Sequence, residues 1–301
     1  MGAQLRIYRR RMRSVKATKK ITRAMELISS SRIVKAQQRV RATSPYTIEI
    51  TNVVTSVATY SNTEHPMISA VAHPRRAAVL IITADRGMAG AYSNAAIKEG
   101  DLLISGLRSQ GLSVDAYLVG RKAVNFYRFR DRAIAGSWTG FSDNPTLDNA
   151  REVSAALITA FLTDTESSGG VDQLYLVYTE FKSMITQTPV SVLFLPVTAA
   201  QQNEPRGIME MYEFESSAET VLNALLPRYV EARVFNAMLQ SAASEHAARR
   251  RAMKSATDNA DELIKSLTRL ANAARQAEIT QELSEIVGGA EALASASAGS
   301  E

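Results

Sequence analysis

The sequence predicts an α/β protein in which a long antiparallel two-helix coiled coil, formed by the N- and C-terminal segments, carries a central Rossmann-like open α/β domain. Three observations predict this class. Residues 213–287 contain one proline, Pro227, and no glycine, and residues 3–60 are interrupted only by Pro45. Between them, apolar runs alternate with amphipathic stretches, which is typical of an open, mostly parallel sheet. The expected plan is a helix at each end and a globular segment between.

The predicted domain boundaries follow from these patterns. We expect a coiled-coil shaft from residues 1–60 and 211–290, a central α/β domain from residues 75–200, and a flexible C-terminal tail from residues 291–301. Residues 163–170 and 199–210 are predicted surface loops, because they are polar and neither is long enough to link two domains.

The N-terminal segment is predicted to be one long helix, with Ser44 and Pro45 marking a kink or a restart. Small residues lie between its apolar positions, and they allow a second helix to approach closely. The apolar positions themselves are sparse: Leu5, Tyr8, Met12, Val15, Ile21, Met25, Ile28, Ile33, Val34 and Val40.

The C-terminal segment carries a heptad-like pattern, which predicts a helix that faces another helix. The pattern alternates spacings of four and three residues through Ala256, Ala260, Leu263, Leu267, Leu270 and Ala274. At about 1.5 Å per residue the whole helix is on the order of 100 Å long, more than a compact domain of this size can bury. The N-terminal helix is its first candidate partner, and the longer C-terminal helix is expected to project beyond the pair.

The pattern of apolar residues in the central segment predicts a β-sheet that is buried on both faces. Residues 77–83 form a continuous apolar run, as expected of a strand buried on both faces. Further strands are expected at 114–119, 174–179 and 190–196, the last of them antiparallel, with helices at 94–109, 121–129 and 146–163.

Composition excludes several classes of protein. Hydrophobic residues make up 46% of the chain, enough for a core, but no apolar run reaches the roughly 18 residues of a membrane span. The N-terminus lacks the apolar region of a secretory signal. The chain has no cysteine, which excludes disulfides and thiolate chemistry, and its three histidines have no ligand-like spacing. No metal site or cofactor is therefore expected.

The charge is strongly asymmetric along the chain. The first 41 residues carry 13 lysines and arginines against one acid, Glu26, whereas five acids and no basic residue follow from Glu278 onward. A pair of helices charged in this way is expected to lie among partners of complementary charge. The alternative is a basic coiled-coil protein that binds nucleic acid, which predicts salt-sensitive binding of DNA or RNA.

The candidate catalytic features are weak. Residues 85–90 form a turn between a strand and a helix, where phosphate loops occur, but they lack both glycine-rich phosphate patterns. Gly87 and Gly90 are interpreted as turn residues, and Asp85 and Arg86 as caps of the turn. The run Arg249 to Arg251 is a candidate for binding phosphate or nucleic acid; its neutral interpretation is a solvated helix face or one that lies against an acidic partner. We therefore expect no enzyme activity from this chain alone; a nucleotide-binding enzyme built on the central segment is the second alternative.

Four segments resemble the F-type ATP synthase gamma subunit family. The longest are residues 13–28 and 275–290, and residues 251–260 and 85–90 resemble it as well. The resemblance spans nearly the whole chain, with the motifs in the family's order. Departures are small: Ser29, Ser30 and Ser31 stand where alanines are commoner, Arg23 replaces a lysine, and the absence of cysteine excludes the thiol regulation of plant chloroplast members.

The resemblance implies a rotor. In that family the terminal helices lie inside a ring of three alpha and three beta subunits, and the α/β domain lies beside the epsilon subunit and on the c-subunit ring. Proton flow turns the c ring, and the shaft forces the catalytic sites of the beta subunits through different nucleotide affinities in sequence. The chain itself is then non-catalytic, binds no cofactor or nucleic acid, and meets the membrane only through the complex.

The resemblance also implies contact residues. Arg275 and Gln276 match positions that contact the alpha/beta ring, with Thr280 and Glu282 close by, and Met25 matches a position near an acidic loop of beta. An acidic partner explains the basic N-terminal helix without nucleic acid. The absence of a transit peptide favours a bacterial member, peripheral on the cytoplasmic face of the plasma membrane.

Overall fold

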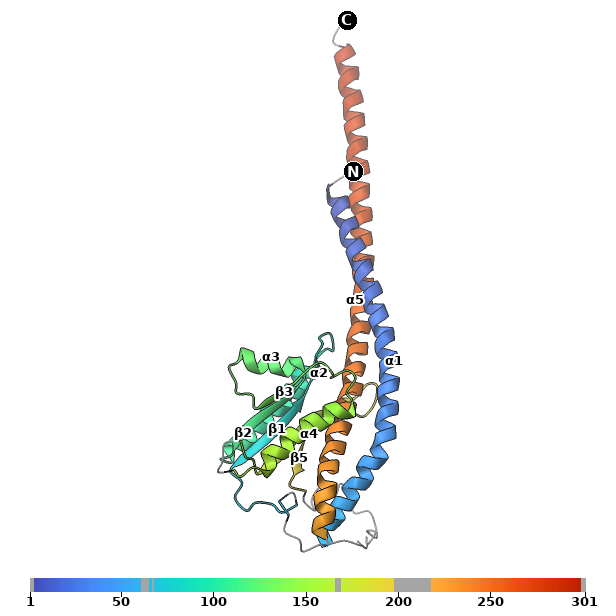
Figure 1. The fold of residues 1–301 in the computed structure, drawn as a ribbon. Helices are drawn as coiled ribbons and strands as arrows, with labels where there is room; N and C mark the ends of the chain where they lie inside the picture. Colours follow the sequence, from blue (N-terminus) through green and yellow to red (C-terminus); the bar gives the residue numbers. More distant parts are fainter. Residues whose placement is uncertain (1–2, 61–64, 67, 166–168, 198–217, 299–301) are drawn as a thin grey trace. The chain divides into compact units, whose positions relative to one another are not determined.

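The structure is a computed structural model that describes residues 3–60, 65–66, 68–165, 169–197 and 218–298. Its elements are α1 (Ala3–Tyr60), β1 (Arg76–Ile82), α2 (Tyr92–Ser109), β2 (Ser113–Val119), α3 (Arg121–Phe129), β3 (Gly136–Trp138), α4 (Leu147–Leu162), β4 (Gln173–Phe181), β5 (Gln187–Leu195) and α5 (Ala218–Ala298) (Figure 1). This order confirms the predicted α/β class with a long helix at either end. The chain divides into two compact units, residues 1–28 with 252–301 and residues 29–251.

Both long helices continue through residues that usually end a helix. α1 is continuous through Pro45, where a kink or restart was one expectation. Around the proline, Ser and Thr hydroxyls donate to carbonyls one turn back, as Ser44 does to Val40 at 2.7 Å. α5 contains Pro227 and passes Gly288 and Gly289 to end at Ala298, whereas the sequence predicted a flexible tail from residue 291. The alanine-rich sequence beyond the glycines has high helix propensity.

The unit of residues 29–251 is built on a five-stranded sheet of order β3-β2-β1-β4-β5. β1 is parallel to β2 and β4, and β2 is parallel to β3. β5 is antiparallel to β4, as the sequence predicted. The short strand β3 was missed, because three residues carry no periodic pattern. The sheet's parallel strands place their carboxyl ends at one edge.

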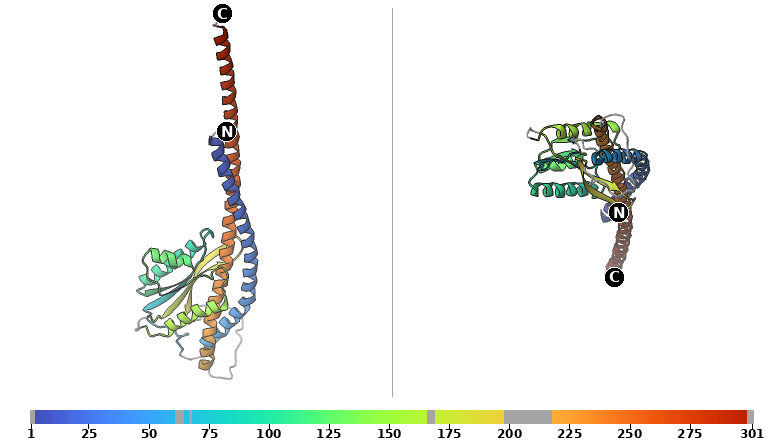
Figure 2. Two further views of the ribbon diagram at one scale, coloured as in Figure 1. Left: turned by 45° about the horizontal axis from the view of Figure 1, so that its top comes forward. Right: turned by 90° about the horizontal axis from the view of Figure 1, so that it is seen from below.

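Side chains of β1 alternate between two covered faces. Ala77, Val79 and Ile81 pack with residues of α2 and α3. Ala78, Leu80 and Ile82 pack with α4 and with the parts of α1 and α5 that belong to this unit. Figure 2 shows α4 on one side of the sheet and α2 and α3 on the other. Burial on both faces explains why β1 is an uninterrupted apolar run.

The part of α5 in this unit is bonded directly to the sheet. The Phe194 ring of β5 stacks on Tyr229, with ring centroids 5.8 Å apart. Along β4, the Thr179 amide donates to Ser241 Oγ at 3.3 Å, and Ser244 Oγ donates to the Thr179 carbonyl at 3.1 Å. Here α5 therefore completes the core of the α/β domain.

The unit of residues 1–28 and 252–301 is an antiparallel helix pair. Thr268 Oγ1 donates to Met12 Sδ at 3.9 Å, and Lys19 forms an ion pair with Asp261. The hydroxyls of Thr22 and Thr257 lie 2.7 Å apart. Partner numbers fall along α5 as they rise along α1, which is the antiparallel pairing that the sequence predicted.

The buried face of this pair matches the predicted one in part, since Ala260 and Leu267 are buried and Ala256 and Ala274 half-buried. Leu263 and Leu270 are 48% and 45% exposed, and the heptad spacing of buried and half-buried residues instead runs through Met253, Thr257, Ala260, Ile264, Leu267, Ala271 and Ala274. On α1, Ile21 and Ile28 are exposed, while Thr22 and Glu26 are buried. The facing helix selects the register, and here it buries Met253 and Leu267 beside small and polar residues while leaving other large apolar residues exposed.

Candidate functional site

Several large apolar side chains are exposed on the surface of the two-helix unit. On α5, Ile279, Leu283 and Ile286 are 53%, 62% and 72% exposed, and their i, i+4, i+7 spacing places them on one face of the helix. Val287 follows Leu283 by four residues and extends this face; the exposed apolar residues elsewhere in the unit are Leu263 and Leu270 on α5 and Ile7, Ile21, Leu27 and Ile28 on α1. Exposed apolar surface of this kind is typical of a region that another protein covers.

The five predicted contact residues fall into two zones. Met25 is half-buried on α1, three residues beyond Thr22, which pairs with Thr257. On α5, Thr280 Oγ1 donates to the Gln276 carbonyl at 3.0 Å, and Arg275 and Glu282 are exposed two turns apart. About 30 Å of α5 separates the level of Met25 from Arg275. The helices therefore place four of these residues together and Met25 apart from them.

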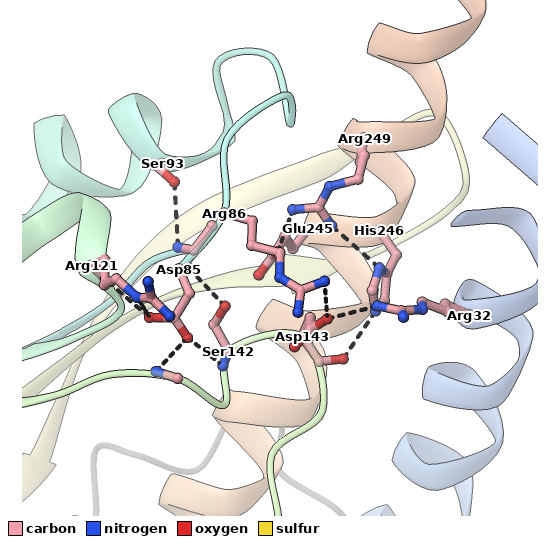
Figure 3. Close-up of polar contacts among 12 residues, drawn as sticks. Arg32, Asp85, Arg86, Ser93, Arg121, Ser142, Asp143, Glu245, His246 and Arg249 are labelled. Atoms are coloured by element: carbon pink, nitrogen blue, oxygen red, sulfur yellow. Dashed lines mark hydrogen bonds and ion pairs between the residues drawn. The ribbon is translucent and has the colours of Figure 1, made fainter. Parts of the chain in front are cut away.

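A polar cluster joins four segments of the other unit, α1, the turn after β1, the loop before α4 and α5, and the sequence did not predict it. We define the Asp143 cluster as Arg32, Arg86, Asp143, Glu245, His246 and Arg249. Asp143 Oδ2 accepts from Arg32 of α1 at 2.6 Å and lies 3.6 Å from Arg86 Nη1. The Asp143 carbonyl bonds to His246 of α5 at 3.0 Å (Figure 3). The loop before α4 is thereby tied to α1 and α5.

Asp85 orders the same loop from the sheet side. It follows the carboxyl end of β1, and its side chain is 5% exposed. Its carboxylate accepts from the amides of Gly140 and Ser142 at 2.8 and 2.9 Å, and from the Arg121 amide at 3.0 Å. Burial opposes ionisation of Asp85, but these backbone bonds outweigh it and lower its pKa. Asp85 therefore caps the start of α3 and the loop of residues 140–142, rather than the 85–90 turn that the sequence interpretation assigned to it.

The cluster contains a buried ion pair within α5. The Glu245 side chain is fully buried, at 0% exposure, and accepts from Arg249 Nη2 at 2.5 Å. Its Oε2 has no hydrogen-bond partner among the residues that the structure describes. Burial raises the pKa of the Glu245 carboxyl, while the Arg249 guanidinium opposes that rise. Arg249 is thus inside the protein, and its interpretation as part of a solvated or partner-facing helix surface was wrong.

The contacts of His246 define its tautomer. The Asp143 carbonyl can only accept, so Nε2 carries the proton, and Nδ1 accepts from Arg249 Nη1 at 3.4 Å. Burial lowers the pKa of His246 to about 4; the Asp143 carbonyl opposes this, and the charges of Arg249 and Arg32 add to it. The imidazole is therefore neutral at pH 7.

The burial of the neutral His246 imidazole predicts that the stability of the folded chain depends on pH. The folded pKa of about 4 lies below the ordinary 6.5, so the unfolded chain binds a proton first as the pH falls. The free energy of unfolding should drop by roughly 3 kcal/mol between pH 6.5 and 4 through this group. Urea unfolding of the full chain, followed by Trp138 fluorescence, measures it. His246→Gln should flatten this part of the profile and the exposed His73→Gln should not; equal slopes in both variants would contradict the assignment.

Within the described ranges, no three His, Asp or Glu side chains gather as a metal-binding group. Among the helices described, none combines the length and the hydrophobicity required to span a membrane.

The chain is similar over its full length to known proteins. The profile of the ATP synthase family matches residues 4–293. The ATP synthase gamma chain of Acidothermus cellulolyticus is 60% identical over 295 residues, which cover 97% of this chain and 98% of that relative. The ATP synthase gamma chain of Streptomyces coelicolor is 58% identical, with all of both chains covered.

Solved structures share the fold. A chain of the Euglena gracilis mitochondrial ATP synthase (OSCP/F1/c-ring, rotational state 3) superposes with a TM-score of 0.68 at 19% identity, covering 97% of this chain and 95% of that one. A chain of the Tetrahymena thermophila mitochondrial ATP synthase central stalk/c-ring gives a TM-score of 0.57 at 23% identity, covering 78% and 99%. With the sequence matches above, the chain belongs to the ATP synthase gamma-chain family.

Proposed function

We propose that the chain is the central-stalk rotor subunit of an F1Fo ATP synthase. It couples proton-driven rotation of the c ring to sequential conformational changes in three catalytic beta subunits, and it catalyses no reaction itself. Its partners are three alpha and three beta subunits, the epsilon subunit and the c ring. It lies on the cytoplasmic face of a bacterial plasma membrane and meets the membrane only through the complex.

The observation that carries this proposal is the exposed apolar surface of the two-helix unit. Ile279, Leu283 and Ile286 lie on one face of α5, and Leu263 and Leu270 lie on another. A surrounding ring would cover both faces with different side chains. As a helix pair with unequal faces turns, it presents different side chains to each of the equivalent surrounding subunits. It can therefore stabilise a different conformation in each of them. This is what a rotor requires.

The predicted domains and contact residues are part of the same proposal. Residues 1–60 and 211–290 serve as the shaft, residues 75–200 as the head and residues 291–301 as the tail. Met25 faces an acidic loop of beta, while the C-terminal contact residues meet the ring farther along α5: Arg275, Gln276, Thr280 and Glu282. The basic side chains of α1 then match acidic partners rather than nucleic acid.

The composition of the native complex tests this proposal. A tagged chain released gently from washed membranes should appear by native mass spectrometry as one copy with three each of two larger subunits, and the complex should hydrolyse ATP where the chain alone does not. Elution of the chain with nucleic acid instead would favour the basic coiled-coil alternative.

Contact along a rotor is distributed, so Gln276→Ala should be tolerated. One exposed hydrogen-bonding side chain contributes about 0.5–1.5 kcal/mol. We therefore expect ATP synthesis by reconstituted complexes to fall by less than about tenfold. Gln281→Ala is the matched control, because the exposed Gln281 side chain donates to Glu285 one turn on, within α5 itself. An assembled Gln276→Ala complex with no turnover would contradict distributed contact.

A further inference from the structure

The Asp85 carboxylate lies at a place where many sheets bind an external anion. In open parallel sheets, phosphate groups bind at the carboxyl ends of strands, on the first turn of the following helix. Asp85 follows β1, and one of its donors is the amide of Arg121, the first residue of α3. The other donors, Gly140 and Ser142, follow β3. A side chain of the protein itself satisfies these backbone N–H groups.

The charge of Asp85 is balanced mainly by these amides. The nearest cationic contact among the described residues is Arg121 Nε at 3.7 Å, and that arginine side chain is 62% exposed. The Asp85 amide in turn donates to Ser142 Oγ at 2.8 Å. The bonds therefore run in both directions between residue 85 and residues 140–142, and they fasten this loop to the end of β1.

The loop then reaches the long helices through its next residue. Asp143 contacts Arg32 of α1 and His246 of α5, at 2.6 and 3.0 Å. Arg86, adjacent to Asp85, lies 3.6 Å from the same carboxylate. Asp85 and Asp143 thus form a continuous polar connection from the sheet to both helices within the unit of residues 29–251 (Figure 3).

We propose that Asp85 is a positioning residue: its carboxylate replaces a bound anion and holds residues 140–142 so that Asp143 fastens the α/β domain to α1 and α5. The inference rests on the proposed function, because transmission of rotation from a head to a shaft requires a stiff attachment. It assigns to the 85–90 turn a mechanical role in place of nucleotide binding.

The test is removal and chemical replacement of the carboxylate. In the assembled complex, Asp85→Gly should raise hydrogen exchange at the amides of Gly140 and Ser142 at least about tenfold, since each loses a charge-assisted bond. Proton-driven ATP synthesis should fall while ATP hydrolysis by the detached F1 part persists. Sodium formate, whose carboxylate fits the vacated space, should restore both readouts, and sodium chloride at equal ionic strength should not.

Asp172 supplies the matched control. Its carboxylate also accepts from backbone amides, those of Arg75 and Arg76 at 2.6 and 3.0 Å, but at the opposite end of β1. Asp172→Gly should loosen its own surroundings without changing exchange at Gly140 and Ser142, and formate should leave ATP synthesis by this variant unchanged.

Three outcomes decide the inference. Wild-type exchange at Gly140 and Ser142 in Asp85→Gly overturns it, and so does a defect that formate does not reverse. If Asp85→Gly fails to assemble, Asp85→Asn decides, because it keeps the shape and removes the charge: faster exchange supports the inference and unchanged exchange overturns it. A wild-type complex that does not couple proton flow to synthesis would reject the proposed function, whereas the exchange result would still test the role of Asp85.

Discussion

Gly120→Ala is expected to lower the free energy of unfolding by about 2–6 kcal/mol, the sum of backbone strain and overpacking. Gly120 joins β2 to α3 with φ of 95°, and an added Cβ would lie 2.2 Å from the Thr83 carbonyl oxygen. Both residues are held in place, because the Thr83 amide donates to the Val119 carbonyl at 2.8 Å and the Gly120 amide donates to the Trp138 carbonyl of β3 at 2.8 Å. Trp138 is the chain's one tryptophan, so its fluorescence during urea unfolding reports directly on this sheet.

Gly111→Ala separates the two contributions. Gly111 has φ of 89°, but nothing lies within 4 Å of its added Cβ. This control should therefore cost only the backbone strain, about 1–3 kcal/mol. Equal losses in the two variants would show that the close approach to Thr83 carries no energetic weight.

Arg249→Met is expected to destabilise the chain by about 3–5 kcal/mol, because it leaves Glu245 buried without its cation. Glu245 is fully buried and accepts from Arg249 at 2.5 Å. The double variant Glu245→Gln with Arg249→Met removes both charges and should recover most of the loss. Unfolding in urea at pH 7, again with Trp138 as the probe, gives all three values.

An exposed pair provides the comparison. Lys254 lies 2.9 Å from Asp258, also at i, i+4 spacing on α5, with side chains 61% and 59% exposed. Lys254→Met should change stability by less than about 1 kcal/mol, as is usual at the surface. If the Arg249 variant were no worse than this one, or if the double variant lost as much as the single one, the buried pair would not have the role assigned here.

Local patterns predicted the elements well because their causes are local. The apolar run of β1 and the long stretches without glycine in α1 and α5 report burial and helix propensity directly. β3 was missed because its three residues pair only through contacts with β2. The order of the strands also depends on contacts between distant segments. The sequence indicated that β5 is antiparallel, but only the structure shows that it pairs with β4.

The facing side chains were harder to predict because they depend on a partner. Leu263 and Leu270 fit a heptad in the sequence, yet the facing α1 selects Ile264 and Ala271. Glu245 and Arg249 are i, i+4 neighbours that look like an ordinary surface pair until the α/β domain covers them. Asp85 was recognised as a turn residue, but its connection to Asp143 spans segments more than fifty residues apart.

Rotation of the chain itself tests the central claim most directly. Because the sequence has no cysteine, a single Ser109→Cys at the exposed end of α2 allows specific attachment of a reporter in the assembled complex. With the alpha and beta subunits fixed to a surface, ATP should drive the reporter in one direction, in three equal steps of about 120° per turn, as a threefold ring requires. Sustained ATP hydrolysis with a stationary reporter would contradict the account.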